Sequence, residues 1–294
     1  MANTIITPNI FAKEVVRKLD RETVFLAHTN RDYEGELKKA GDTVRVQTLP
    51  NLTFTASAIV GAGDVTNSDV GTGPGAAIAA SDFAITVESL IIDKYSEKRV
   101  QIPSIEMVQS NLSVEEKVAE RFSQGLGVLL DDSVVTQILT TQVASIPAGN
   151  KLDSGAPITL SKSNVYKAVI DLRKALRAKN VKVSQMRLFV GTDAEAFLLQ
   201  APEFTSGSNE AFGVVKSGYI GMIAGVPVYV TTALDSSKEL IMMAEGAVNC
   251  VIQVADTKVT EGVDGFYTNV MAQLIYGMKI FGENLNAVAI QYCA

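Results

Sequence analysis

The sequence predicts an α+β protein in which the last strands return to an earlier part of the fold, so that one domain is discontinuous. Three observations predict this class. Helical patterns with 3.6-residue spacing and strand patterns with alternating side chains both occur, one helical pattern is much longer than the others, and two strand patterns stand near the end of the 294-residue chain. With 47% apolar residues, a chain of this length has enough material for one large core or two smaller ones.

An amphipathic helix is the first expected element. Thr7 can cap a helix, and Pro8 suits its first turn. Basic side chains lie largely off the apolar face, which is formed by Phe11, Val15, Leu19, Thr23 and Leu26. We expect this N-terminal helix to dock on the body of the protein or to bind a partner.

The sequence pattern of residues 43–93 predicts a long two-stranded arm with a flexible tip. Strand patterns stand at 44–49 and 84–92. The segment between them is rich in Gly and Ala and cannot form a core of its own. A loop of this length is unusual inside a compact domain, so we expect the arm to reach for a partner. The arm has a net charge of −4, because Arg45 is its only base against five acids.

A long helical pattern is the centre of the prediction. Ser113 and Glu116 are spaced as a capping box, in which each side chain bonds to the backbone of the other residue. A stripe of apolar side chains continues to about Val143, so we expect a spine helix over residues 113–143. Residues 146–150, with the sequence Ile-Pro-Ala-Gly-Asn, mark a boundary.

Helical and strand patterns alternate through the rest of the chain. An amphipathic helix is expected over 163–179, with inward-facing Val165, Val169, Leu172 and Leu176. The segment Gly191-Thr192-Asp193 is expected to cap a short helix that ends near Leu199. The expected strands are 186–190, 226–231, 240–244, 250–254, 274–280 and 287–292.

The composition argues against an enzyme. His28 is the only histidine, which removes His-paired metal sites and most Ser-His-Asp chemistry, and we interpret it as a polar residue at a helix end. The net charge of −6 and the absence of Trp argue against a dedicated duplex binder or a stacking platform. Cys250 and Cys293 are expected to be reduced thiols. We expect neither a membrane span nor a secretory leader.

Two local motifs resemble ligand sites but lack parts that those sites need. The glycines of residues 71–75 are not followed by the Lys-Ser/Thr and helix of a phosphate loop. Asp64, Asn67 and Asp69 lack the spacing and the distal Glu of a calcium loop, so we interpret them as a solvated acidic tip. No cofactor or metal site is therefore expected.

Basic and acidic residues gather on different parts of the chain. Residues 151–187 carry nine bases and two acids, a net charge of +7, whereas residues 188–294 carry four bases and eleven acids, a net charge of −7. Such faces can meet across a subunit boundary in a repeating assembly. The basic helix 162–182 can also face nucleic acid through phosphate contacts; we prefer a solvated or intersubunit face, although a container for DNA allows both. Asp131 and Asp132 are expected on an exposed helix face in contact with another subunit.

Three segments carry a likeness to a known family. Residues 41–46, Gly-Asp-Thr-Val-Arg-Val, resemble the start of an extended arm; residues 188–199 resemble the strand–helix unit of an axial domain; and residues 218–230 resemble a glycine-marked strand near axial loops. Together with the order of the predicted elements, they make nearly the whole chain resemble the major capsid protein of tailed bacteriophages, with the Hong-Kong-97-type shell fold.

This resemblance implies a structural coat protein without catalytic activity or cofactors. Copies would self-assemble into pentamers and hexamers of an icosahedral phage head around double-stranded DNA, in the bacterial host cytoplasm, with the extended arm lying over a neighbour. The implied domains are an N-terminal arm at 1–42, an extended β-hairpin arm at 43–95, a peripheral domain at 96–150 plus 270–294, and an axial domain at 151–269.

Two departures from the family refine this expectation. Residues 1–42 are too few for the scaffolding segment that some members carry, so we expect a separate scaffolding protein, in addition to a portal. No Lys lies between Lys39 and Lys94, so we expect no covalent links from the arm. The alternatives are an encapsulin-like compartment shell and a soluble enzyme of unknown chemistry. The intersubunit or DNA-facing candidates are Arg45, Asp64, Asp69, Asp131, Asp132, Lys167, Arg173, Lys174 and Arg177.

Overall fold

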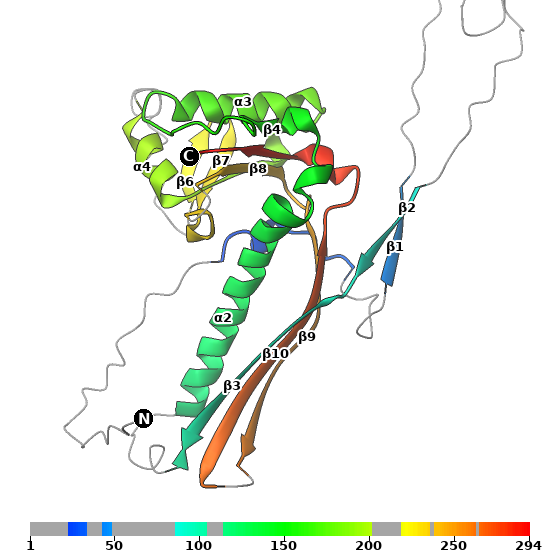
Figure 1. The fold of residues 1–294 in the computed structure, drawn as a ribbon, viewed down its shortest axis with the longest axis vertical. Coiled ribbons are helices and arrows are strands. Elements are labelled where there is room, and N and C mark those ends of the chain that lie inside the picture. The colour runs from blue at the N-terminus through cyan, green and yellow to red at the C-terminus, as the bar shows by residue number, and fades with distance from the viewer. Residues whose placement is uncertain are drawn as a thin grey trace, which may run out of the picture. The chain divides into compact units, whose positions relative to one another are not determined.

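The computed structural model describes residues 23–33, 43–48, 86–104, 114–201, 219–235, 238–262 and 265–294, and these form the predicted α+β arrangement (Figure 1). Two units make up the chain, the first with Met1–Val44 and Leu90–Ala294, and the second with Arg45–Ser89. Single 3-10 turns connect the larger elements at η1 (Leu26–His28), η3 (Val143–Ser145), η4 (Ala148–Asn150), η5 (Val183–Gln185), η6 (Thr232–Leu234) and η7 (Asn284–Ala287).

The arm begins and ends in two paired strands. Strands β1 (Thr43–Thr48) and β2 (Thr86–Ile91) form a two-stranded sheet, as their sequence patterns predict. On β1 the exposed Arg45 and Gln47 flank a half-buried Val46, which is the expected alternation of a strand. The predicted flexible tip lies in residues 49–85, outside the described residues, and stays a prediction.

A long three-stranded antiparallel sheet has β10 (Tyr267–Lys279) at its centre. Strand β3 (Lys94–Pro103) pairs with one edge of β10, and β9 (Asn249–Glu261) pairs with the other. The predicted strands 250–254 and 274–280 are therefore too short. Their missing halves carry polar residues that hide the strand pattern, and the Gly-rich hairpin turn between them was not recognised.

Helix α2 (Val114–Thr136) lies along this sheet and buries one stripe against it (Figure 1). The Ser133 hydroxyl and the Tyr276 hydroxyl of β10 are 2.7 Å apart, in hydrogen-bond contact. The buried apolar positions Leu130, Val134 and Ile138 follow helical spacing. Thus the spine helix is confirmed, although its α-helical part ends at Thr136, seven residues before the predicted end.

The side-chain amide of Gln142 explains why helix α2 gives way to a π-helical turn after Thr136. The turn η2 (Gln137–Thr141) is π-helical, and the Gln142 backbone N–H donates to the Gln137 carbonyl at 3.0 Å. The Gln142 amide donates to the Ile280 carbonyl at 2.9 Å and accepts from the Ile280 N–H at 2.6 Å. These bonds fix the widened turn to the end of β10, so the helix is held at this junction.

A six-stranded mixed sheet forms the other part of this unit, in the order β4–β11–β8–β5–β7–β6. Helices α3 (Val165–Ala178) and α4 (Thr192–Gln200) pack beside it. Strands β5, β7, β8 and β11 confirm the predicted ones within one or two residues. Strand β4 was not predicted, and β6 lies in residues 218–230, which resembled a single glycine-marked strand. The strands are β4 (Lys151–Leu152), β5 (Met186–Val190), β6 (Tyr219–Ile223), β7 (Val226–Val230), β8 (Leu240–Ala244) and β11 (Val288–Gln291).

Both faces of the central strands of this sheet are buried. Along β5, Phe189 points into a core shared with α2 and the N-terminal segment, whereas its neighbours Leu188 and Val190 point into the core under α3 and α4. Strand β8 alternates in the same way, with Ile241 on the first side and Met242 on the second. Successive strand side chains face opposite ways, so these strands connect two hydrophobic cores.

The N-terminal segment 23–33 is an extended strap with one 3-10 turn. Residues 23–25 are not helical, so the last part of the predicted N-terminal helix is wrong; its other residues lie outside the described ranges. Phe25 is fully buried, and its ring stacks on that of Phe189 at 4.2 Å between centroids. Asn30 forms a parallel bridge with Asn249. Tertiary packing of Phe25 therefore overrides the helical periodicity.

The cap of α4 comes from a distant residue. Gly191 is the N-cap, and no side chain of the predicted Gly191-Thr192-Asp193 segment caps the helix. The Asp235 carboxylate instead accepts hydrogen bonds from the Thr192 N–H at 2.8 Å and the Thr192 hydroxyl at 3.0 Å. A Cβ at position 191 would lie 2.9 Å from this carboxylate oxygen, so Gly191 leaves room for it.

Another glycine stands where two strands cross. Gly277 of β10 is buried, and a Cβ there would overlap the carbonyl oxygen of Ile91 and approach the Cα of Ile92 to 3.1 Å. These are backbone atoms, which cannot move aside as a flexible side chain can. The absence of a side chain at Gly277 therefore lets the chain pass close to β10 at the end of β2.

Candidate functional site

The predicted basic helix is present, and its cations face solvent. Helix α3 buries Val165, Ala168, Val169, Leu172 and Leu176 in the core under the six-stranded sheet. Lys167 and Lys174 are exposed on the opposite side, as the helical spacing predicts, and Arg177 is exposed next to them. Among the described residues, none of these three cations takes part in an ion pair.

A second stripe on the same helix mixes cations with apolar groups. Tyr166, Ile170, Arg173 and Arg177 follow the i, i+4, i+7, i+11 spacing and share one flank of α3. We call these four residues the α3 stripe. Arg173 is half-buried, and its Nε has no accessible surface and no hydrogen-bond partner within the described parts of the chain. The stripe therefore contains a guanidinium donor held at the edge of the helix.

Further cations flank the helix at both ends. Lys162 precedes α3, and Lys179 and Lys182 follow it; all three are exposed. Asp171 is the one acid between Lys162 and Lys182. The basic character that the sequence predicts is thus a real surface property of this layer.

Asp131 corrects an expectation. It is fully buried, so the prediction of an exposed side chain in contact with another subunit is wrong. Its carboxylate accepts from the N–H of Val24 at 2.9 Å and of Leu26 at 2.8 Å, which attaches the N-terminal strap to the spine helix. The neighbouring Asp132 is exposed, because residues one apart on a helix point about 100° apart.

The candidates on the arm are only partly described. Arg45 is exposed on β1. Asp64 and Asp69 lie outside the described residues, so the predicted acidic tip stays a prediction. A contact role for these three residues is likewise untested.

The tip of the β9–β10 hairpin presents an aromatic side chain that sequence reasoning missed. Phe266 is 95% exposed, although its carbonyl accepts a hydrogen bond from the Ser104 N–H at 3.0 Å. A Phe between Gly265 and a strand was the available signal, but its exposure depends on a hairpin that the sequence did not reveal.

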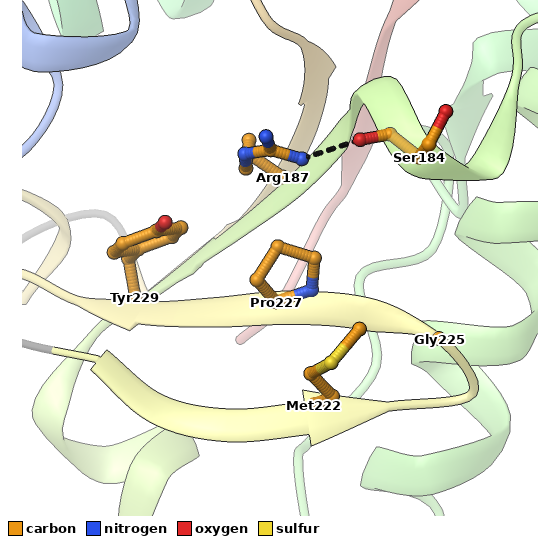
Figure 2. A pocket seen from close by; sticks show the side chains of 6 residues that line it. All are labelled: Ser184, Arg187, Met222, Gly225, Pro227 and Tyr229. Atoms are coloured by element: carbon orange, nitrogen blue, oxygen red, sulfur yellow. Dashed lines mark hydrogen bonds between the residues drawn. The ribbon is translucent and has the colours of Figure 1, made fainter.

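A shallow cavity of about 480 Å³ lies beside strands β6 and β7 (Figure 2). Six residues line it: Ser184, Arg187, Met222, Gly225, Pro227 and Tyr229. The Arg187 guanidinium donates to the Ser184 carbonyl at 2.8 Å and forms an ion pair with Glu245 at 2.6 Å, so its positive charge is paired within the subunit. Among the six lining residues no nucleophile is paired with a base, as the active site of a hydrolase would need.

His28 lies near this cavity and has no catalytic geometry. Its ring packs against Tyr229 at 4.5 Å and against Phe189 at 5.6 Å. Burial lowers the pKa of His28 below 6.5, and the nearby Arg187 charge lowers it further, while Glu245 opposes this. His28 therefore lies at a helix end, as predicted, but the helix is the short 3-10 turn η1, where the ring is half-buried and packed against Tyr229.

The cysteines and other titratable groups form no reactive cluster. Both Cys250 and Cys293 are free, and burial together with the Glu239 charge raises the pKa of Cys293 to about 11. Within the described ranges, no group of three His, Cys, Asp or Glu side chains could hold a metal ion. No helix in those ranges is long and apolar enough to cross a membrane.

Comparison with protein families decides the class of this protein. Residues 92–283 match the family model described as phage capsid protein. The chain belongs to this phage capsid family. As a member, this capsid protein is a structural component of the virion and not an enzyme, as the sequence predicts.

Solved structures share the fold over nearly the whole chain. The capsid protein is similar to a structure from Mycobacterium phage Che8, with 18% identity, a TM-score of 0.74 and 98% of each chain covered. It is also similar to the capsid of cyanophage P-SCSP1u, with 14% identity, a TM-score of 0.70 and 97% and 92% coverage. A virus-like particle from Pyrococcus furiosus matches with 16% identity, a TM-score of 0.50 and 91% of each chain. No curated protein sequence matches.

Proposed function

We propose that this capsid protein builds an icosahedral phage head from pentamers and hexamers and that the head encloses double-stranded DNA. The observation that carries the proposal is the family match over residues 92–283, together with a fold shared along 98% of the chain with a phage structure. A shell subunit makes many moderate contacts at once, so each contact can stay weak and correctable while the closed shell is stable.

The arm supplies one of these contacts in this proposal. Residues Arg45–Ser89 form a unit of their own, and the two strands at its base are paired. In the proposed shell the arm, residues 43–95, lies over a neighbouring subunit. Residues 1–42 then form the N-terminal arm, 96–150 plus 270–294 the peripheral domain, and 151–269 the axial domain.

The proposed partners are further copies of the chain, a separate scaffolding protein, a portal and the packaged DNA. Assembly takes place in the cytoplasm of the bacterial host, and the DNA contacts are nonspecific phosphate contacts. No covalent link from the arm is proposed, because no Lys lies between Lys39 and Lys94. A covalent ladder on a denaturing gel of intact particles would contradict this part.

Expression with the neighbouring gene products, followed by electron microscopy, tests the proposal. Closed, regular shells are expected with the wild-type chain. Deletion of residues 61–75 should leave a folded subunit, measured by its thermal unfolding, but few closed shells. A deletion variant that gives wild-type particle yields would refute the role of the arm, and a wild-type chain that forms no particles would refute the shell itself.

An encapsulin-like compartment is the second candidate function. The fold match to a virus-like particle from Pyrococcus furiosus over 91% of this chain supports a closed shell, which this candidate shares with the phage head. The contents of purified particles separate the two candidates. Nuclease-protected DNA supports the phage head, whereas a packaged enzyme without DNA supports the compartment.

A further inference from the structure

The α3 stripe has the composition of a protein contact. It places one aromatic ring and one aliphatic side chain next to two arginines, Arg173 and Arg177, on a single flank of α3. Protein interfaces are enriched in aromatic residues and Arg and depleted of Lys. We propose that the α3 stripe is the seam between neighbouring copies of this chain, and that it binds the acidic first turn of α4 of the next copy.

The stripe fits a protein better than it fits DNA. Contacts to a phosphate backbone need positive charge alone, and the exposed Lys167 and Lys174 supply it. The stripe instead surrounds its guanidinium groups with Tyr166 and Ile170, which gain from being covered by a second protein surface. Arg also pairs with carboxylates in a planar, two-bonded geometry that Lys cannot reproduce.

Arg173 gives the seam its most specific element. Its Nε is buried at the edge of the helix without an acceptor in the described ranges. The side chain of Arg173 as a whole is half-buried, and a carboxylate from outside the subunit can pair with its guanidinium in a charge-assisted bond. The stripe therefore holds an arginine at the helix edge that has room for an acidic partner.

The complementary surface lies on the same layer of the same unit. Asp193 and Glu195 stand in the first turn of α4, with Asp193 exposed and Glu195 half-exposed, and α4 contacts α3 beside the six-stranded sheet. No ion pair of either acid is found within the described ranges. A ring of identical subunits needs two different patches on each copy, one for each neighbour. The basic stripe and the acidic turn are two such patches of opposite charge.

This inference rests on the proposed assembly into pentamers and hexamers, and charge exchange tests it. The double variant Arg173→Glu with Arg177→Glu should lower the yield of shells by about tenfold or more, because it places like charges across the seam. Asp193→Lys with Glu195→Lys should do the same. The combination of all four changes restores the opposite charges and should return the yield to near that of the wild type.

Two further variants keep the test decisive. The first is the pair Arg177→Glu and Asp193→Lys, which changes only exposed residues. Each change alone should lower the shell yield, and the pair should restore it, without misfolding as a cause. Lys162→Glu with Lys182→Glu is the matched control, since it makes the same change in charge away from the stripe. It should leave the shell yield unchanged, and thermal unfolding should confirm that every variant is folded.

The outcomes separate the seam from the proposed function. If the wild-type chain forms shells but the combination of all four changes does not restore the yield, the seam is overturned and the proposed phage head still stands. Normal shells with less protected DNA, in the arginine variant and the lysine control alike, assign the face to DNA and also overturn the seam. A wild-type chain that stays monomeric under every condition overturns both proposals.

Discussion

Two strands of the six-stranded sheet and the edge strand of the three-stranded sheet differ in how much of their surface the chain itself covers. Strand β8 of the six-stranded sheet is buried at all five positions, and β11 at all four. Strand β3 of the three-stranded sheet has one buried residue, Ile102, among ten. The β9–β10 hairpin of the same sheet ends at the nearly fully exposed Phe266.

This difference separates the surface that folds the subunit from the surface left for association. Burial of apolar area in the two cores of the six-stranded sheet stabilises the isolated chain. The three-stranded sheet is buried by α2 along one stripe, and its edge strand and tip remain exposed. We therefore expect changes in the six-stranded sheet to alter unfolding, and changes at the hairpin tip to alter assembly.

The largest expected effect is that of Phe189→Ala. The side chain is fully buried and contacts Phe25, His28 and Tyr229, so its removal leaves a cavity between the strap and the sheet. We expect the free energy of unfolding to fall by about 3–5 kcal/mol, measured by urea denaturation of the unassembled subunit. A loss well under half of this value would mean that the strap is not part of the folded core.

Asp131→Ala tests the attachment of the strap to the spine helix. It removes the acceptor for the N–H groups of Val24 and Leu26, and we expect a loss of about 1.5–3 kcal/mol in the free energy of unfolding. The adjacent and exposed Asp132→Ala is the matched control and should change stability by less than about 0.5 kcal/mol. Equal losses from both variants would contradict the assigned role of Asp131.

The pH dependence of stability gives a smaller test of the same region. Burial lowers the pKa of folded His28 below 6.5, so the unfolded state binds more protons once the pH falls below that value. Stability should therefore decrease as the pH falls from about 7 to about 5, and His28→Gln should reduce this slope. The slope comes from urea midpoints at several pH values, and an unchanged slope in the variant would exclude His28 as its source.

Phe266→Ala should have the smallest effect on folding. The side chain is 95% exposed, so we expect the free energy of unfolding to change by less than about 0.5 kcal/mol. In the proposed shell we expect a neighbouring copy to cover this ring, so the yield of closed shells should nevertheless fall. The same substitution at Phe189 and Phe266 thus gives opposite results in the two measurements; normal shells from Phe266→Ala would mean that the tip meets no neighbour.

The sequence predicted the elements whose patterns are local. Helix α3 and strand β5 have clear helical and buried-strand periods, and both were placed within two residues. The basic face of α3 followed directly from the same periodicity. The paired strands of the arm were likewise visible from their alternation.

Long-range contacts account for most of what was missed. The burial of Asp131 depends on a strap more than 100 residues away in sequence, and two adjacent acids otherwise indicate an exposed face. The cap of α4 comes from Asp235, 43 residues from its partner Thr192. The outer halves of β9 and β10 are strands because they pair with each other, although their residues are largely polar.

The crossing at Gly277 has a steric consequence. Strand β2 ends at Ile91, and the next residues pass so close to β10 that no side chain fits between them. Any side chain at position 277 would overlap backbone atoms, so Gly277→Ala would force the segment at Ile91 and Ile92 away from the central strand of the long sheet.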